Sequence, residues 1–329
     1  MNASPEYNMK MGGKYHIKIQ NKFLNFFQDV ELHSQTFLEQ FDIQSLKILC
    51  CENVEPSLIN SSITQLDIQM CDIESIDGLQ LENLLELNLQ QNKLTQIQSI
   101  KKFINLQKMT ISDNQLINLS GIETLKLLKF LNLSYCQIKD ISILKNMSCL
   151  QELDVSRNRG IDLQPLQFMT QLTKLNLSYL SNILNTTQNL DLSVLEQLIN
   201  LEDLDISNNT GVNTSWLKYL VKLVILNIES NELQNTNFLE YLLNLEEINL
   251  SSNKNTDLQP LSKIIKLKKL NLSDNKLLNV QFLSTLINLE HLNLENNLDI
   301  DITPLQNLEK LTYLNVQSVT FIVFLIYNF

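Results

Sequence analysis

Apolar residues recur along most of the chain in a block of nine residues, at its first, fourth and sixth positions. Typical copies read LLELNLQQN (84–92) and LKKLNLSDN (267–275), and twelve such blocks lie within 63–319. A weaker copy, IQSLKILCC (43–51), begins the series. So regular a repeat predicts one elongated domain of stacked units, in which each unit buries its apolar side against its neighbours.

The interval between blocks is 22 residues almost throughout, but 20 and then 21 at the start. One irregular unit, 172–200, has 29 residues, and its extra residues fall around 181–190. Insertions in such arrays emerge as loops. The alternatives for this loop are a tolerated surface bulge and a part of a binding face.

Each block predicts a short strand, because apolar and polar residues alternate at its fourth to sixth positions, as in Leu87, Asn88 and Leu89. The return path contains DLQPL at 162–166 and again at 257–261, which predicts an Asp-capped helical or 3₁₀ turn with proline near its start. The expected fold class is α/β. We expect a horseshoe-shaped solenoid of about 12–13 units, with a parallel sheet on the concave face and short helical or 3₁₀ segments on the convex face.

The ninth position of the block is polar in most units, although it falls where the chain turns into the core. A buried asparagine is costly unless its amide is hydrogen-bonded, so these residues predict a structural ladder between neighbouring units. Cysteine is small and a weak donor, and it can substitute at 71 and 136. The ladder asparagines are Asn92, Asn114, Asn158, Asn209, Asn231, Asn253, Asn275 and Asn297.

The two ends of the chain do not repeat. In 1–42, Phe23, Phe26, Phe27 and Val30 have helical spacing and predict a helical cap over the first unit, with a recruitment helix as the alternative. The apolar tail 320–329 has three interpretations: a makeshift cap, a dimerisation patch or a truncated end. Self-association through this end is the resulting hypothesis.

The third, fifth and seventh positions of the block are expected to face solvent on the concave sheet. Acids outnumber bases there by nine to three from residue 65 onward, and a few large apolar residues interrupt the polar ones. An acidic surface with aromatic anchors predicts a protein partner with a basic surface. The candidate partner-binding residues are Glu86, Phe130, Tyr135, Glu152, Asp154, Tyr179, Asp203, Asp205, Ile225 and Glu247.

The formal net charge of −11 argues against nucleic acid and anionic lipid as partners, since both recruit lysine and arginine. The five cysteines have no metal-binding spacing, and residues 1–22 lack the apolar run of a signal peptide. The apolar tail is shorter than the roughly 20 residues that a membrane span needs. We therefore expect an intracellular, cytoplasmic protein without a membrane span.

An enzymatic function is not expected. His16, His33 and His291 lie far apart in the sequence, and neither a phosphate-binding G-x-x-x-x-G-K-[ST] nor a G-x-G-x-x-G motif is present. The serines of the repeated NLS belong to a column of the repeat and not to a nucleophile elbow. We expect no catalytic residue, no metal site and no cofactor.

The unit L-x-x-L-x-L-x-x-N-x-L, with D-x-x-P-L on the return path, resembles the leucine-rich-repeat family over residues 43–319. It looks most like the subfamily that contains the regulatory subunit of type 1 protein phosphatase and the bacterial internalins. The resemblance implies a scaffold that grips another protein on its concave face. It also implies the alternative of a regulatory subunit of a protein phosphatase, while a self-assembling structural component is a third hypothesis.

Overall fold

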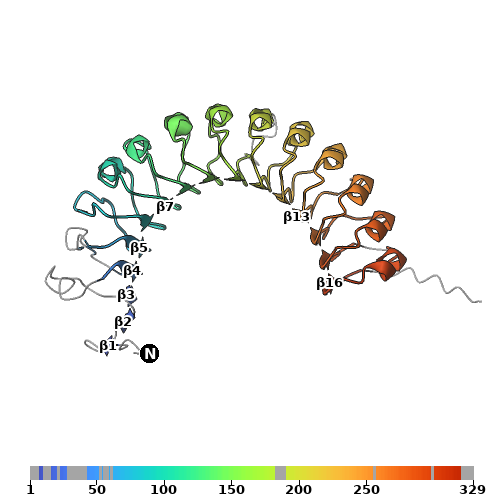
Figure 1. The fold of residues 1–329 in the computed structure, drawn as a ribbon, viewed down its shortest axis with the longest axis horizontal. Coiled ribbons are helices and arrows are strands. Elements are labelled where there is room, and N and C mark those ends of the chain that lie inside the picture. Colours follow the sequence, from blue (N-terminus) through green and yellow to red (C-terminus); the bar gives the residue numbers. More distant parts are fainter. Residues whose placement is uncertain are drawn as a thin grey trace, which may run out of the picture. The chain divides into compact units, whose positions relative to one another are not determined.

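A computed structural model describes residues 7–9, 16–20 and 23–27 by their backbone. It describes 43–51, 54, 59, 62–181, 190–254, 257–297 and 300–319 with their side chains. The chain forms two compact units, Met1–Gln171 (unit 1) and Leu172–Phe329 (unit 2). Each unit is a stack of repeats in which a strand and a return segment alternate (Figure 1).

Unit 1 contains nine described strands and four described 3₁₀ helices. These are β1 (Tyr7–Met9), β2 (His16–Gln20), β3 (Phe23–Phe27), β4 (Ser45–Leu49), β5 (Gln65–Gln69), β6 (Glu86–Asn88), η2 (Gln98–Lys102), β7 (Lys108–Thr110), η3 (Ile122–Thr124), β8 (Phe130–Asn132), η4 (Ser142–Asn146), β9 (Glu152–Asp154) and η5 (Gln164–Phe168).

Unit 2 contains seven described strands and six described 3₁₀ helices. These are β10 (Lys174–Asn176), η6 (Ser193–Gln197), β11 (Asp203–Asp205), η7 (Ser215–Tyr219), β12 (Ile225–Asn227), η8 (Asn237–Tyr241), β13 (Glu247–Asn249), η9 (Gln259–Lys263), β14 (Lys269–Asn271), η10 (Gln281–Thr285), β15 (His291–Asn293), η11 (Thr303–Asn307) and β16 (Tyr313–Asn315).

Within each unit the repeat strands pair in parallel and in chain order, as in Ile225↔Glu247 and Leu226↔Ile248. The strands form the concave side of each unit and the 3₁₀ helices form the convex side (Figure 1). This is the predicted leucine-rich-repeat solenoid. From β6 to β16 the described return segments contain 3₁₀ helices of three to five residues, which suits the few residues available per unit, whereas the segment between β5 and β6 contains turns only.

The core of each unit lies between these two layers. In the described repeats before the last one, the fourth and sixth block positions are buried, as at Leu226 and Ile228, and so are return-path residues such as Leu239 and Leu242. Burial of an aliphatic side chain contributes about 1.5–3 kcal/mol, and each repeat supplies several such side chains. A single repeat cannot bury them alone, so stacking is the condition for folding.

The predicted helix at Phe23–Val30 is wrong over the part that the structure describes. Phe23–Phe27 is strand β3, which pairs antiparallel with β2 and parallel with β4, in the register Phe23↔Ser45. A helix there would leave the backbone groups along β4 unpaired, whereas an added strand satisfies them. The region 28–42, with the rest of the expected helical cap, lies outside the described residues.

Each ladder asparagine bonds to two successive repeats. The Nδ2 of Asn253 donates to the carbonyl oxygens of Ile228 in the preceding repeat (2.8 Å) and Leu250 in its own (3.1 Å). Its Oδ1 accepts the backbone N–H groups of Asn231 (3.0 Å) and Leu233 (3.4 Å). The amide is buried. The side chain of Asn253 thus provides hydrogen-bond partners for four backbone groups that lie outside the paired strands.

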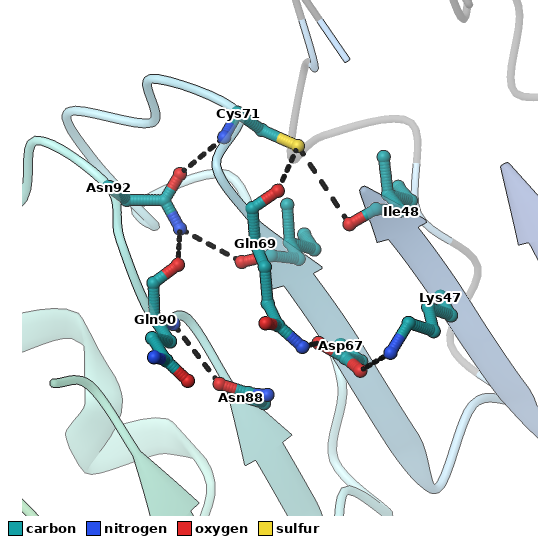
Figure 2. Close-up of polar contacts among 9 residues, drawn as sticks. Lys47, Ile48, Asp67, Gln69, Cys71, Asn88, Gln90 and Asn92 are labelled. Atoms are coloured by element: carbon teal, nitrogen blue, oxygen red, sulfur yellow. Dashed lines mark hydrogen bonds and ion pairs between the residues drawn. The ribbon is translucent and has the colours of Figure 1, made fainter. Parts of the chain in front are cut away.

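Cysteine replaces asparagine in three repeats of unit 1. In Figure 2, Asn92 Oδ1 accepts the N–H of Cys71, and the Cys71 thiol donates to the carbonyl of Ile48 at 3.8 Å. The Cys136 thiol likewise donates to the carbonyl of Ile111 at 3.0 Å. Burial raises the pKa of the Cys136 thiol to about 12, so it remains a protonated donor at neutral pH.

The residue before the ladder position has a left-handed backbone in every described repeat. Its φ lies between 53° and 60° from the second repeat onward, although none of these residues is glycine. This conformation costs roughly 1–2 kcal/mol per residue. The N–H of such residues bonds to the next repeat, as Ser230 N does to the carbonyl of Ser251 at 3.0 Å, and this helps to offset the strain.

Aspartate or asparagine side chains begin most of the 3₁₀ helices. Asp162 Oδ1 accepts the N–H of Gln164 (3.0 Å) and Asp257 Oδ1 that of Gln259 (2.9 Å), so in both DLQPL segments the aspartate bonds to the first residue of the helix from one position before the N-cap residue, which is a leucine. The bonds from Ser142 also lower the pKa of the Asp140 carboxyl. This stabilisation is present at neutral pH and is lost as the pH falls through the lowered pKa, because the unfolded state takes up the proton first.

The 29-residue unit keeps the strand register of its neighbours. Lys174 pairs with Asp203 and Asn176 with Asp205, the same positions that pair across 22-residue units. Its ladder position is Leu180, whose N–H donates to Asn209 Oδ1 at 2.8 Å. Most of the inserted segment (182–189) lies outside the described residues, as does the apolar tail 320–329.

We expect replacement of Asn253 by alanine to lower the free energy of unfolding by about 2–4 kcal/mol, because buried backbone groups of two repeats lose their partners. Asn244→Ala is the control. This asparagine is exposed, and its loss is expected to cost about 0.5–1 kcal/mol. Urea unfolding followed by circular dichroism measures both, and equal losses would show that the ladder does not stabilise the stack.

We expect Cys136 to resist alkylation, since its thiol is buried and protonated. A timed pulse of iodoacetamide at pH 8, read by peptide mass mapping, measures this. The exposed Cys149 is the internal control and is expected to react at least about 100-fold faster. Modification of the two thiols at one rate would contradict the burial of this column.

Candidate protein-binding face

The outward surface of the strands is formed by the third and fifth block positions. In β13, Glu247 and Asn249 are partly exposed and flank the buried Ile248. We call the outward side of β4–β9 the unit 1 face and that of β10–β16 the unit 2 face. The pairing places the third positions of adjacent repeats side by side, about 4.8 Å apart.

The seventh block position was predicted to face solvent, but it is buried in six of the described repeats. The strands from β6 onward are only three residues long, so the in–out alternation ends at the fifth position and the chain then turns inward. The buried serines of this column are Ser112, Ser156, Ser178, Ser207, Ser251 and Ser273.

The nearly uniform fifth position has a structural role. Its side-chain oxygen accepts the N–H group two residues later, as in Asp154 to Ser156 (2.9 Å) and Asp205 to Ser207 (2.9 Å). These turns direct the chain away from the sheet. Asp154 and Asp205, two of the candidate partner-binding residues, therefore use one carboxylate oxygen within their own repeat.

The unit 1 face carries an open hollow of about 430 Å³ over β4–β9. Third-position residues of six adjacent strands line it: Ser45, Gln65, Glu86, Lys108, Phe130 and Glu152. The Nζ of Lys108 lies 5.7 Å from the centre of the Phe130 ring, a cation–π distance. The structure thus brings together three of the candidate partner-binding residues, Glu86, Phe130 and Glu152.

A lysine outside the charge count also borders this face. Lys47 Nζ lies 2.9 Å from Asp67 Oδ2, and Gln69 Nε2 donates to Asp67 Oδ1 at 2.7 Å (Figure 2). Asp67 lines the hollow together with Glu86 and Glu152, but its carboxylate is partly neutralised by Lys47. Glu152 lies beside Phe130 on the next strand, whereas Glu86 lies two strands from Phe130 with Lys108 between them.

Two of the expected aromatic anchors lie elsewhere. Tyr135 and Tyr179 occupy the left-handed position after β8 and β10, with φ of 56° and 59°. They lie at the edge where the strands end and not on the outward surface of the sheet. Tyr135 is exposed, whereas Tyr179 is partly buried.

The acids of the unit 2 face are mostly engaged with neighbours. Lys174 Nζ lies 2.5 Å from Asp203 Oδ2, and Lys269 Nζ lies 2.9 Å from Glu247 Oε2. Asp205 Oδ2 accepts from Asn227 at 3.0 Å. Ile225, the first residue of β12, is 36% exposed. Three candidates on this face, Asp203, Glu247 and Asp205, are thus tied to the next or the preceding repeat.

An aromatic pair on the unit 2 face was not among the candidates. His291 and Tyr313 stack with ring centres 6.0 Å apart and an interplanar angle of 27°. Their 22-residue spacing was the available signal, because residues one repeat apart become cross-strand neighbours.

Within the described part of the chain, no three His, Cys, Asp or Glu residues lie close enough together to hold a metal ion. No helix among those residues is both long and apolar enough to cross a membrane.

We expect Asp205→Asn to keep the free energy of unfolding within about 0.5 kcal/mol of the wild type, because asparagine keeps the oxygen that accepts the N–H of Ser207. Asp205→Ala is expected to lose about 1–2 kcal/mol, since that buried N–H then lacks its partner. Urea unfolding of both variants separates charge from turn formation. Equal losses would mean that the carboxylate charge stabilises the fold.

Residues 126–168 match a family model described as leucine-rich repeats in two copies. No curated protein matches the chain by sequence. The fold is similar to an internalin from Listeria monocytogenes, with 23% identity, a TM-score of 0.65, and coverage of 85% of this chain and 88% of the other.

A leucine-rich-repeat protein from Leptospira interrogans is also similar, with 24% identity, a TM-score of 0.70, and coverage of 90% and 82%. Toll of Drosophila, solved in complex with Spatzle, has 16% identity and a TM-score of 0.63. That match covers 98% of this chain but only 58% of the other. The chain thus matches the leucine-rich-repeat model over residues 126–168, and its solenoid fold is similar to that of these leucine-rich-repeat structures.

Proposed function

We propose that the protein is a non-catalytic interaction scaffold whose unit 1 face binds a protein with a basic surface. The observation that supports this proposal most directly is the hollow on the parallel sheet, where strand pairing places Phe130 between Lys108 and Glu152. A partly exposed aromatic ring with Glu152 on one side and Lys108 on the other offers an apolar anchor and a charge pattern to the same partner.

The rigidity of the sheet favours binding. The fourth-position residues of these strands are buried, so the outward residues are held in place before a partner arrives. A preformed surface spends little free energy on ordering. Glu86 and Glu152 supply negative charge for electrostatic steering of a basic partner.

The fold neighbours are consistent with this function. Leucine-rich-repeat proteins typically mediate protein–protein interactions, and Toll was solved in complex with Spatzle. We also propose a reducing, cytoplasmic location, supported by the five free cysteines.

Two more specific functions of the protein are alternatives to this proposal. One is regulation of a protein phosphatase, suggested by the repeat consensus. The other is self-assembly through the last repeat, where Leu314 is 41% exposed although its column is buried in the preceding strands.

The test is affinity capture with quantitative mass spectrometry, followed by titration of the leading purified partner. We expect Glu86→Lys/Glu152→Lys to weaken that binding at least about tenfold, because two carboxylates that line the hollow are replaced by charges of the same sign as a basic partner. We also expect wild-type binding to weaken between 0.15 and 0.5 M salt, an increase that shortens the Debye length from about 8 Å to nearer 4 Å.

Glu74→Lys/Glu82→Lys is the matched control, because it makes the same change in net charge at exposed positions away from the strands of unit 1. Retained binding by Glu86→Lys/Glu152→Lys would exclude the unit 1 face. Purified type 1 phosphatase catalytic subunit is titrated in parallel. Binding of that subunit, abolished by the same variant, would favour the regulatory role. An increase in the molecular mass of the purified protein with its concentration, in the absence of any partner, would favour self-assembly.

A further inference from the structure

A row of exposed aliphatic side chains runs along unit 2 away from its strand face. The residue two positions before each block is aliphatic in five consecutive repeats: Ile199, Val221, Leu243, Ile265 and Ile287. These side chains are between 47% and 58% exposed. They lie in the turn that joins each 3₁₀ helix to the next strand, and we call them the edge stripe.

The edge stripe is not a general property of the repeat. The same position in unit 1 holds Glu82, Ile104, Lys126, Ser148 and Thr170, of which only Ile104 is aliphatic. In the last repeat of unit 2 it holds Glu309. The turn itself therefore does not require an aliphatic residue, and continuous exposed apolar rows of this kind mark interaction sites.

The spacing of the edge stripe is fixed by bonds between repeats. Asn244 Nδ2 donates to the carbonyl of Val221 at 3.0 Å, and Asn288 Nδ2 to that of Ile265 at 2.8 Å. Three residues after Val221, the N–H of Val224 already bonds to the preceding repeat. The stripe residues therefore follow the strand spacing of about 4.8 Å, which gives a row roughly 19 Å long.

This spacing selects among regular backbones. One turn of an α-helix rises 5.4 Å, so five turn-spaced residues span about 22 Å and stay near the stripe residues along the whole row. Same-face residues of a β-strand are about 6.7 Å apart, so five of them would span roughly 27 Å. At the far end they would be displaced from the stripe residues by more than the spacing of one repeat. A helix fits the edge stripe and a strand does not.

Lysines border the edge stripe at every second repeat. Lys222, Lys266 and Lys310 each donate to the asparagine at the same position one repeat earlier, at 2.8, 2.8 and 2.6 Å. These ammonium groups are about 10 Å apart by the repeat spacing, close to two helical turns. Farther toward the strand face lie Glu202, Glu246 and Glu290, of which Glu246 is paired with Lys268 at 2.7 Å.

We propose that the edge stripe binds an amphipathic α-helix of a partner protein, with one apolar residue per turn and carboxylates two turns apart beside them. Tyr219 and Tyr241, exposed two residues before Val221 and Leu243 at the ends of η7 and η8, extend the exposed apolar residues toward the 3₁₀ helices. This site is independent of the unit 1 face, so either can be present without the other.

The probe is a synthetic peptide of about 18 residues, or five turns, with leucine at i, i+4, i+7, i+11 and i+14 and glutamate beside the first, third and fifth leucines. Its binding is measured by fluorescence anisotropy. We expect the wild type to bind it and Leu243→Glu/Ile265→Glu to weaken binding at least about tenfold. Ile104→Glu, an exposed residue at the same repeat position in unit 1, is the matched control and is expected to leave binding unchanged.

Two further peptides test the specificity of the site. Replacing the glutamates by lysine is expected to weaken binding, and placing the leucines at every second residue is expected to abolish it. No binding by the wild type, equal binding by Leu243→Glu/Ile265→Glu, or tighter binding of the alternating peptide would each overturn the proposal. It would also be overturned if sedimentation showed a wild-type dimer that the double variant dissociates, since the stripe would then bind a second copy.

Circular dichroism and urea unfolding of the variants accompany the titrations. The substituted residues are half exposed, so native spectra and wild-type midpoints are expected. Binding to phosphatidylserine vesicles in place of the peptide would assign the stripe and its lysines to a lipid surface and would reject the helix as occupant.

Discussion

The side-chain amide of each ladder asparagine holds two successive repeats together, and the fold of both units depends on it. A parallel sheet of three-residue strands has few backbone hydrogen bonds per repeat, so the turn after each strand must be fixed by other means. Asn253 shows how: one side chain satisfies carbonyls and N–H groups of two repeats in a buried position. Because the left-handed residue before it directs the amide inward, its backbone strain is part of the same device.

Much of this architecture can be read from the sequence, because its periodicity reports burial directly. Alternation around Leu226 and Ile228 identifies the inward side of a strand, and asparagine at the turn identifies the ladder. Thiols at 71 and 136 were expected to replace it as donors, and their bonds have that form. The short period also predicts the return segments, since 22 residues leave room for only one turn of helix.

The structure differs from the expectations where the periodicity of the sequence alone does not determine the backbone conformation. Phe23–Phe27 has spacing compatible with a helix, but strand pairing with β4 prevails. The seventh block position was expected to face outward, yet Ser207 and Ser251 are buried because the strands end two residues earlier. Tyr135 and Tyr179 could not be placed from spacing, since the left-handed turn moves them to the edge of the sheet. Ion pairs such as Lys269–Glu247 also reduce the acidic excess that composition suggests.

The preserved register of the 29-residue unit has an implication for how such chains diversify. Lys174 and Asp203 pair in the same register as the corresponding residues of 22-residue units. The extra residues therefore leave the sheet without shifting its strands relative to one another. Length changes at this point are thus mechanically uncoupled from the surface formed by the strands. New segments can be acquired in one return path, by duplication or by design, while every outward side chain on the strands keeps its neighbours.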